Sequence, residues 1–159
     1  MENSPWGFDP ADRGGWSVIF RPGGAVDGSA NGLSDAAPFP EVRLRPERAL
    51  SLPQPEQLGA DTDGLSVEEL DAIEEATNAI YGDQPAHQVG GFASPIQDAG
   101  MELEAQLASN GLYCGNAAGY SDPRAADLAS GAQDWRLLLQ LDSDESADLM
   151  WGDCGRLYF

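Results

Sequence analysis

A near-continuous apolar run at residues 135–141 constrains the fold more than any other feature of this sequence. The run reads WRLLLQL, is too short for a typical helix and precedes the polar stretch DSDES, so it predicts a central strand buried on both faces. A tight turn is predicted at residues 152–155, and the RLYF that follows predicts the start of another strand. Because that strand ends on apolar residues without a polar stop, we expect the sheet to continue beyond Phe159.

The best helix is predicted over residues 66–81. Ser66 and Glu69 have the spacing of a capping box, in which each side chain accepts a hydrogen bond from the backbone of the other residue. Apolar residues then recur at helical spacing, and Gly82 is well placed to end the helix. These features predict an ordinary surface helix whose acidic face is more often solvated than functional.

Two shorter helices are expected further along the chain. One is predicted at residues 98–110, where Gly111 stops it. The other begins with Asp122 and Pro123 as its cap and first residue, and ends before Gly131.

Additional strands are predicted before the first helix. Residues 16–20 (WSVIF) are aromatic and β-branched, and residues 42–45 (VRLR) alternate between apolar and charged side chains. Glycine and proline near residues 23–40 and 53–64 predict flexible loops. A chain of 159 residues has the usual size of a single domain.

The formal net charge of −19 restricts the partners of this chain. All eight basic residues are arginines, and none of them lies between residues 49 and 123. Such a field repels nucleic-acid phosphates and anionic lipids, so we expect neither nucleic acid nor membrane as a partner. A basic protein partner fits the charge. Simple solubility fits it too, and is the more common reason for such a composition.

The cysteine and hydropathy patterns indicate a cytoplasmic location. Cys114 and Cys154 are not part of a CxxC pair and are too few for a disulfide framework, so reduced thiols are expected. No apolar stretch approaches the roughly 18 residues of a membrane span. The first residues lack the basic and apolar regions of a signal peptide.

Several motifs resemble the YwqG-like family, a bacterial domain of unknown function that carries number 1963 in the usual naming. The resemblance covers most of the chain, including WGFDP at residues 6–10, and the spacing of the motifs matches. The motifs that carry it are HQVGG at 87–91, PIQ at 95–97, LLQLDSD at 138–144 and MWGDCGRLYF at 150–159.

The resemblance implies an α+β fold with a mainly antiparallel sheet and two or three flanking helices, and it implies no reaction. Members of the family begin with an upstream segment and continue past the last strand found here. We therefore expect residues 1–159 to form a single, partial YwqG-like domain.

His87 is the sole histidine and is followed by Gln88 and two glycines. A histidine can act as a general base or a metal ligand. No cysteine or second histidine sits at ligand spacing, so we expect no metal and no cofactor. The interpretation we favour is structural, with His87 binding backbone groups near the turn.

Carboxylates crowd residues 142–148. Oxygen ligands of this kind suit Ca²⁺, but the spacing lacks the glycine and the distal glutamate of an EF-hand. A solvated turn with an Asx-type hydrogen bond is the more common outcome. Asp153 lies between glycines beside Trp151, where it either accepts amides of the turn or contributes to a ligand site.

Two functional hypotheses follow. The first is a non-enzymatic, acidic interaction module that binds a basic protein, one concrete version being an immunity-like protein. The second is a hydrolase-like or small-ligand-binding domain, with His87, Gln97 and Asp153 lining one pocket beside Trp151. No serine elbow or glycine-rich phosphate loop is present, so catalytic residues are not assigned and enzymatic activity is the less favoured reading.

Overall fold

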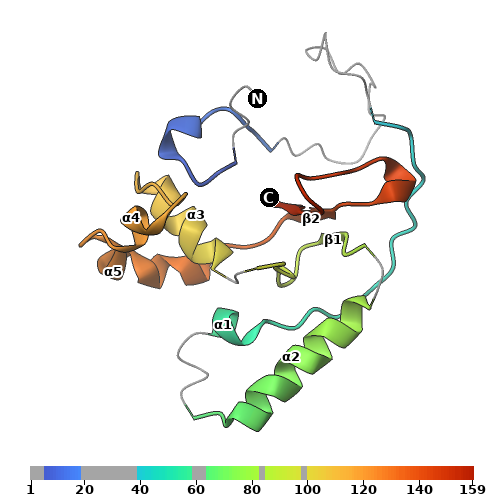
Figure 1. The fold of residues 1–159 in the computed structure, drawn as a ribbon, viewed down its shortest axis with the longest axis horizontal. Helices are drawn as coiled ribbons and strands as arrows, with labels where there is room; N and C mark the ends of the chain where they lie inside the picture. The colour runs from blue at the N-terminus through green and yellow to red at the C-terminus, as the bar shows by residue number, and fades with distance from the viewer. Residues whose placement is uncertain (1–5, 19–38, 59–63, 83–84, 98–99) are drawn as a thin grey trace.

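The structure is a computed structural model that describes residues 6–18, 39–58, 64–82, 85–97 and 100–159. Its centre is a three-stranded antiparallel sheet in the order β1-β2-β3 (Figure 1). The strands are β1 (Gln88–Val89), β2 (Leu139–Asp142) and β3 (Arg156–Tyr158). Helices lie beside this sheet (Figure 1), so the expected α+β class is confirmed.

The burial of β2 differs from the prediction. The buried positions are the polar Gln140, which is fully buried, and Asp142, whereas Leu139 and Leu141 are only half-buried. The strand also begins at Leu139 and not at residue 135. A strand buried on both faces was therefore the wrong prediction, because an apolar run does not reveal which face receives the main contacts. The predicted second strand is confirmed as β3.

The small apolar core lies among the helices beside the sheet. It consists of buried residues from α3 (Met101–Ser109), α5 (Ala125–Leu128) and the loop between α3 and α4 (Ala117–Tyr120). The buried core residues are Leu107, Ala108, Leu112, Cys114 and Ala125. Phe8 packs against this core, and its carbonyl oxygen accepts a hydrogen bond from the Cys114 amide, which attaches the N-terminal segment to the helices.

The ends of these helices correct two boundaries. The second helix begins at Met101, while Asp98 lies outside the described residues, and Gly111 follows it with a φ of +86°. The third helix does not stop before Gly131, because α5 continues into the 3-10 helix Ala129–Asp134. Gly131 lies inside this 3-10 helix, next to the end of the Gln106 side chain of α3, and so it does not mark a helix end.

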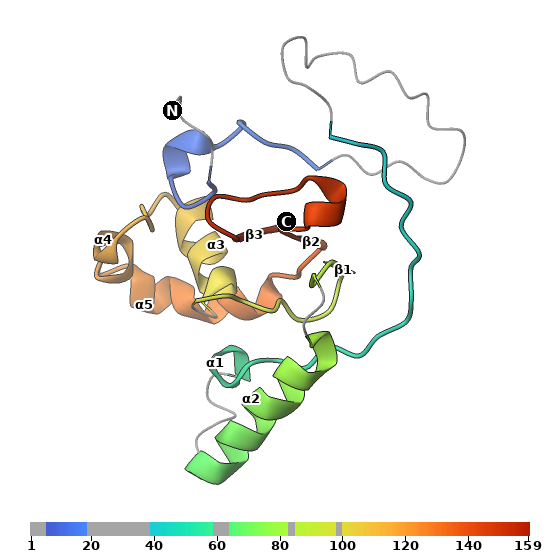
Figure 2. The ribbon, with the colours of Figure 1, turned by 45° about the vertical axis from the view of Figure 1, so that its right-hand side comes forward.

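The helix α2 (Val67–Tyr81) confirms the predicted capping box. The Ser66 hydroxyl accepts a hydrogen bond from the Glu69 amide, and the Glu69 carboxylate accepts one from the Ser66 amide at 2.8 Å. Gly82 follows with a φ of +55°. The helix packs against the short α1 (Pro55–Leu58) and extends away from the sheet and from the other helices in both views (Figures 1 and 2).

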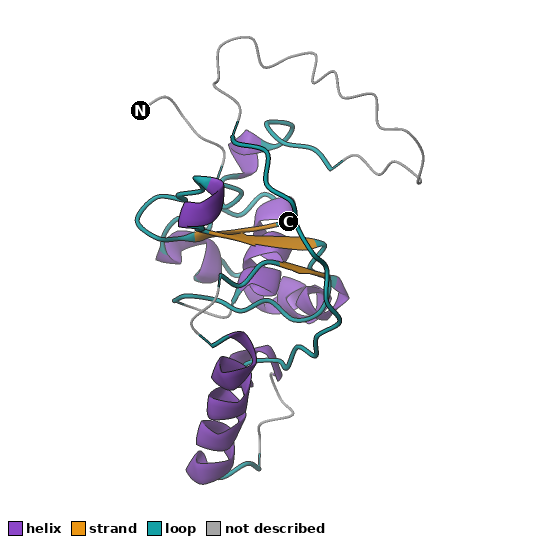
Figure 3. Cartoon of the chain, turned by 90° about the vertical axis from the view of Figure 1, so that its right-hand side faces the viewer, coloured by secondary structure: helices purple, strands orange, loops and turns teal. Residues whose placement is uncertain are grey.

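Neither of the two strands predicted before α1 is present in the described residues. Residues 16–18 belong to no strand, while 19 and 20 lie outside the described residues. Residues 42–45 run in an exposed loop, which Figure 3 shows between the grey segment and α1. Alternation favours a strand only where another strand is available for pairing, and in the described part of the chain none pairs with either segment.

The predicted loops fall partly outside the described ranges. Residues 23–38 and 59–63 are not described, and residues 55–58, expected in a loop, form α1. Among the helices of the described residues, none combines the length and the hydropathy that a bilayer span requires.

Candidate functional site: a polar cluster on the sheet

Asp142 occupies the centre of a polar cluster on one face of the sheet. Its Oδ2 accepts a hydrogen bond from the Ala86 amide at 2.7 Å, and its Oδ1 accepts one from the Ser143 amide at 2.9 Å. The Arg156 Nε lies 2.9 Å from Oδ2. Burial acts to raise the pKa of Asp142, but the arginine and the two amides outweigh it and lower the pKa below its ordinary value.

Arg156 connects the sheet to the segment that follows β1. Its Nη1 donates to the carbonyl oxygen and to the hydroxyl of Ser94, at 2.6 and 3.0 Å. The Nε group is close enough to Asp142 for an ion pair, yet its N–H direction does not meet the geometry of a hydrogen bond. We therefore describe the Arg156–Asp142 contact as electrostatic. Tyr158 donates to the same Ser94 carbonyl at 3.3 Å, and burial raises the pKa of its hydroxyl.

Gln140 forms the buried floor of the cluster. Its side chain is fully buried, its Oε1 accepts a hydrogen bond from the Ser94 amide at 2.9 Å, and its Nε2 donates to the Ala86 carbonyl at 2.5 Å. One side-chain amide thereby forms hydrogen bonds with main-chain groups on both sides of β1, which is itself only two residues long. Buried main-chain groups left without partners would each cost about 1–3 kcal/mol.

His87 binds a main-chain group, as the structural interpretation predicts. The Asp142 amide donates to His87 Nδ1 at 3.1 Å, so Nδ1 carries no proton in this arrangement. The proton of the neutral ring is then on Nε2, which lies 3.1 Å from Asp144 Oδ2. Both ring nitrogens therefore have partners within the fold.

Asp144 also confirms the predicted Asx-type turn. Its Oδ1 accepts hydrogen bonds from the amide and the hydroxyl of Ser146, at 2.8 and 2.7 Å. The Ser146 hydroxyl is the main cause of the lowered pKa of Asp144, and His87 adds to it. One carboxylate oxygen of Asp144 therefore binds Ser146 in the turn, and the other contacts His87.

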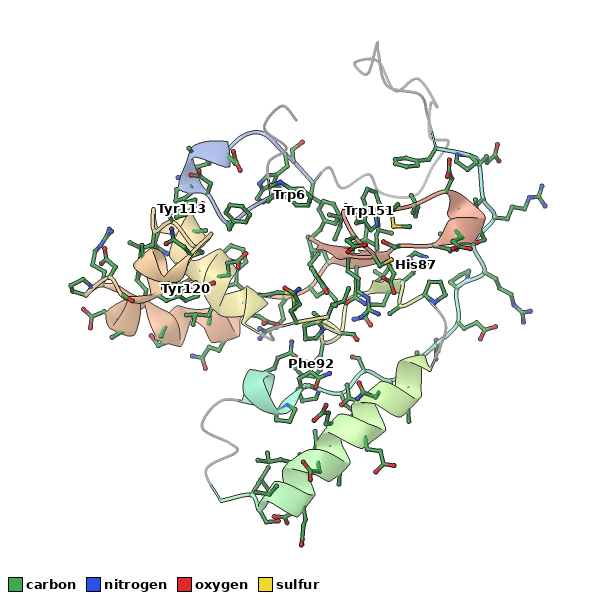
Figure 4. All side chains as sticks on the ribbon, viewed as in Figure 1. Trp6, His87, Phe92, Tyr113, Tyr120 and Trp151 are labelled. Carbon is green, nitrogen blue, oxygen red and sulfur yellow. The ribbon has the colours of Figure 1, made fainter. Side chains whose placement is uncertain are left out.

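Trp151 contacts Asp142, the residue whose amide also binds His87. Its indole Nε1 donates to the Asp142 carbonyl at 3.1 Å, and its ring meets Phe39 edge to face at 5.8 Å between centroids. His87 and Trp151 therefore bind the N–H and the C=O of Asp142, and Figure 4 shows both of them beside the sheet.

Gln97 and Asp153 lie apart from these interactions. Both side chains are exposed, and neither forms a hydrogen bond with another described residue. The structure thus brings together His87 and Trp151 of the four candidates. That all four contribute to one ligand site stays a prediction.

The association of Gln140, Asp142 and Arg156 in one cluster is not predicted from the sequence. The available signal was polar residues at alternate positions within the apolar run.

The described residues contain no group of three or more histidine, cysteine or carboxylate side chains arranged to hold a metal ion. Cys114 is buried, and its pKa is raised by burial and then by Glu104, which disfavours a thiolate nucleophile there.

Comparison with protein families gives one match. The model of the family described as a domain of unknown function (DUF1963) matches residues 1–159. The chain belongs to this family. The match confirms the resemblance to YwqG-like domains, and the family's description assigns no activity or ligand. No curated protein and no solved structure matches the chain.

Proposed function

We propose that this DUF1963 domain is a non-enzymatic interaction module whose acidic surface binds a basic protein. The observation that carries the proposal is the exposed face of α2. Four carboxylates on this helix are exposed and form no ion pair with a described residue, and the helix contains no basic side chain. These four residues are Glu68, Asp71, Glu74 and Glu75.

The environment of this helix suits recognition. Because α2 extends away from the sheet, a partner can approach it without displacing the polar cluster (Figure 2). Val67 is 73% exposed at its first turn and supplies apolar surface beside the acids. A complementary basic protein would be steered to this face, and its association rate would fall as salt screens the charges. Neutralisation of a basic toxin, as an immunity-like protein performs it, is one version of this function.

The polar cluster supports the same proposal in a different way. Asp142, Arg156 and Gln140 bind each other or main-chain groups, and both nitrogens of His87 have partners inside the fold. A general base must be within reach of the proton that it abstracts, and His87 is occupied in this arrangement. The cluster therefore suits a role in fixing the sheet.

The test is capture of partners from a lysate of the organism that encodes the chain, at low ionic strength. A variant neutralises the α2 face by Glu68→Gln, Asp71→Asn, Glu74→Gln and Glu75→Gln. A charge-matched control changes exposed acids elsewhere, by Asp127→Asn, Asp134→Asn, Glu145→Gln and Asp148→Asn. We expect the wild type and the control to retain a basic protein that the α2 variant loses. The purified pair should then bind more weakly as salt is raised. Retention of no protein, or equal retention by all three chains, would contradict the proposal.

The alternative is the hydrolase-like or small-ligand-binding domain around His87, Gln97 and Asp153. It predicts that a ligand changes the NMR signals of all three side chains together. The sole histidine makes its ring signals simple to follow in such a titration.

A further inference from the structure

A basic segment stands out on this acidic chain. Residues 41–48 (EVRLRPER), here called the arginine strap, carry three arginines against two glutamates. Every residue of the strap is exposed, and the strap forms neither helix nor strand. The guanidinium-bearing side chain of Arg45 is 90% exposed, and its contact with Glu47 is 3.6 Å long. Such an exposed pair contributes little and exchanges readily for another carboxylate.

The α2 helix presents the complementary pattern. Glu68, Asp71 and Glu75 follow one another at intervals of three and four residues, so they share one face of the helix. Asp71 and Glu75 are separated by about 6 Å along the helix axis. All three side chains are exposed.

The spacing of the strap arginines matches that of these acids. Arg43 and Arg45 are two residues apart, and in an extended chain such residues point to the same side with a separation of about 6.6 Å. Pro46 favours the extended conformation at Arg45. Two arginines can therefore meet Asp71 and Glu75 in register. Among the described residues of a single chain, no ion pair joins the strap to α2.

We propose that the arginine strap of one copy binds the α2 face of a second copy. The two surfaces differ, so the contact is head to tail and can repeat along a row of molecules. It uses the same face of α2 that a basic partner protein would use, and such a partner would displace the strap. The contact does not require that partner to exist, because both surfaces belong to this chain.

The charges of the whole chain make the salt dependence diagnostic. Two chains of −19 repel each other at low ionic strength, where screening is weak. At about 0.1 M salt the Debye length is about 10 Å, so the repulsion between whole molecules is reduced while ion pairs in contact persist. High salt then weakens the ion pairs too. Self-association should therefore be strongest at intermediate salt, whereas purely apolar association would strengthen steadily.

The experiment is sedimentation velocity of the full chain from micromolar to about millimolar concentration over a series of NaCl concentrations. One variant carries Arg43→Glu and Arg45→Glu, a second carries Asp71→Arg and Glu75→Arg, and a control carries Arg124→Glu and Arg136→Glu. We expect the first two to raise the dissociation constant at least roughly tenfold and the control to behave as wild type.

Mixing provides the decisive measurement. An equimolar mixture of the strap variant and the α2 variant restores opposite charges between different chains, so the mixture should associate more tightly than either variant does alone. Combining all four changes in one chain should restore self-association as well, which excludes a simple folding defect. A wild-type chain that stays monomeric throughout, or a mixture that does not associate, would overturn the proposal. Neither result bears on the capture of a basic partner by α2.

Discussion

Arg156 Nε lies 2.9 Å from Asp142 Oδ2, directly across the pairing of β2 and β3. This is an ion pair in a largely buried position, with 17% and 10% of the two side chains exposed. Removal of one partner from such a pair leaves the other charge buried without compensation. Substitution of only one of the two residues should therefore lower the free energy of unfolding more than the ion pair itself contributes.

The change Arg156→Leu should lower the free energy of unfolding by about 3–5 kcal/mol. Urea denaturation followed by tryptophan fluorescence measures this loss. The control is Arg124→Leu, which removes an arginine from an exposed pair with Asp122 and should barely shift the midpoint. Equal shifts for the two variants would show that the buried pair has no special weight.

Acidification should destabilise the protein below about pH 4. The pKa values of Asp142 and Asp144 are lowered from 3.8 in the folded state. The unfolded chain therefore binds protons first, so the stabilisation is complete above the unfolded pKa and is lost as the pH falls through the folded pKa. Urea midpoints between neutral pH and about pH 2 should show this decline. It should be shallower for Asp144→Asn, and superimposable profiles would contradict the assignment.

The change Gln140→Leu should destabilise the protein even though it adds an apolar side chain. It leaves the Ser94 amide and the Ala86 carbonyl without their partners, at about 1–3 kcal/mol for each group. The same substitution at the exposed Gln97 is the matched control and should leave the free energy of unfolding nearly unchanged. A neutral Gln140→Leu would mean that the segment after β1 finds other partners.

The change Gly119→Ala should cost about 1–3 kcal/mol of unfolding free energy, because its methyl group would overlap the Tyr113 carbonyl oxygen. At Gly64 a methyl group would meet no atom within 4 Å, so Gly64→Ala should be tolerated. Thermal melts of the two variants distinguish these outcomes. Similar melting temperatures would show that the loop before α4 can shift.

The sequence predicts those features that depend on neighbouring residues alone. The capping box of Ser66 and Glu69, the glycine after α3 and the Asx-type turn at Asp144 each need only a few consecutive residues, and all three are confirmed. The family could also be predicted from the sequence, because motifs and their spacing are compared along the chain and no tertiary contact is needed.

Features that depend on distant partners were missed. The two-residue strand β1 is paired with β2, and the Gln140 amide further fixes the neighbouring segment, a contact across more than 40 residues that no local pattern reveals. Residues 42–45 have the alternation of a strand and pair with none in the described chain. Gly131 was predicted to follow a helix, but it lies within the 3-10 helix Ala129–Asp134, which packs against α3, and no local pattern reveals this continuation.

The buried polar positions of β2 also determine how this sheet can vary. In most half-buried strands, a shift of one residue is penalised because leucines move into water. Here a shift would instead carry leucines toward Ala86 and Ser94 and leave Arg156 without its carboxylate. The register of β2 is thus encoded by specific hydrogen-bonding groups, which tolerate fewer replacements than aliphatic side chains do. Sequence drift should accordingly be freer at Leu139 and Leu141 than at Gln140 and Asp142.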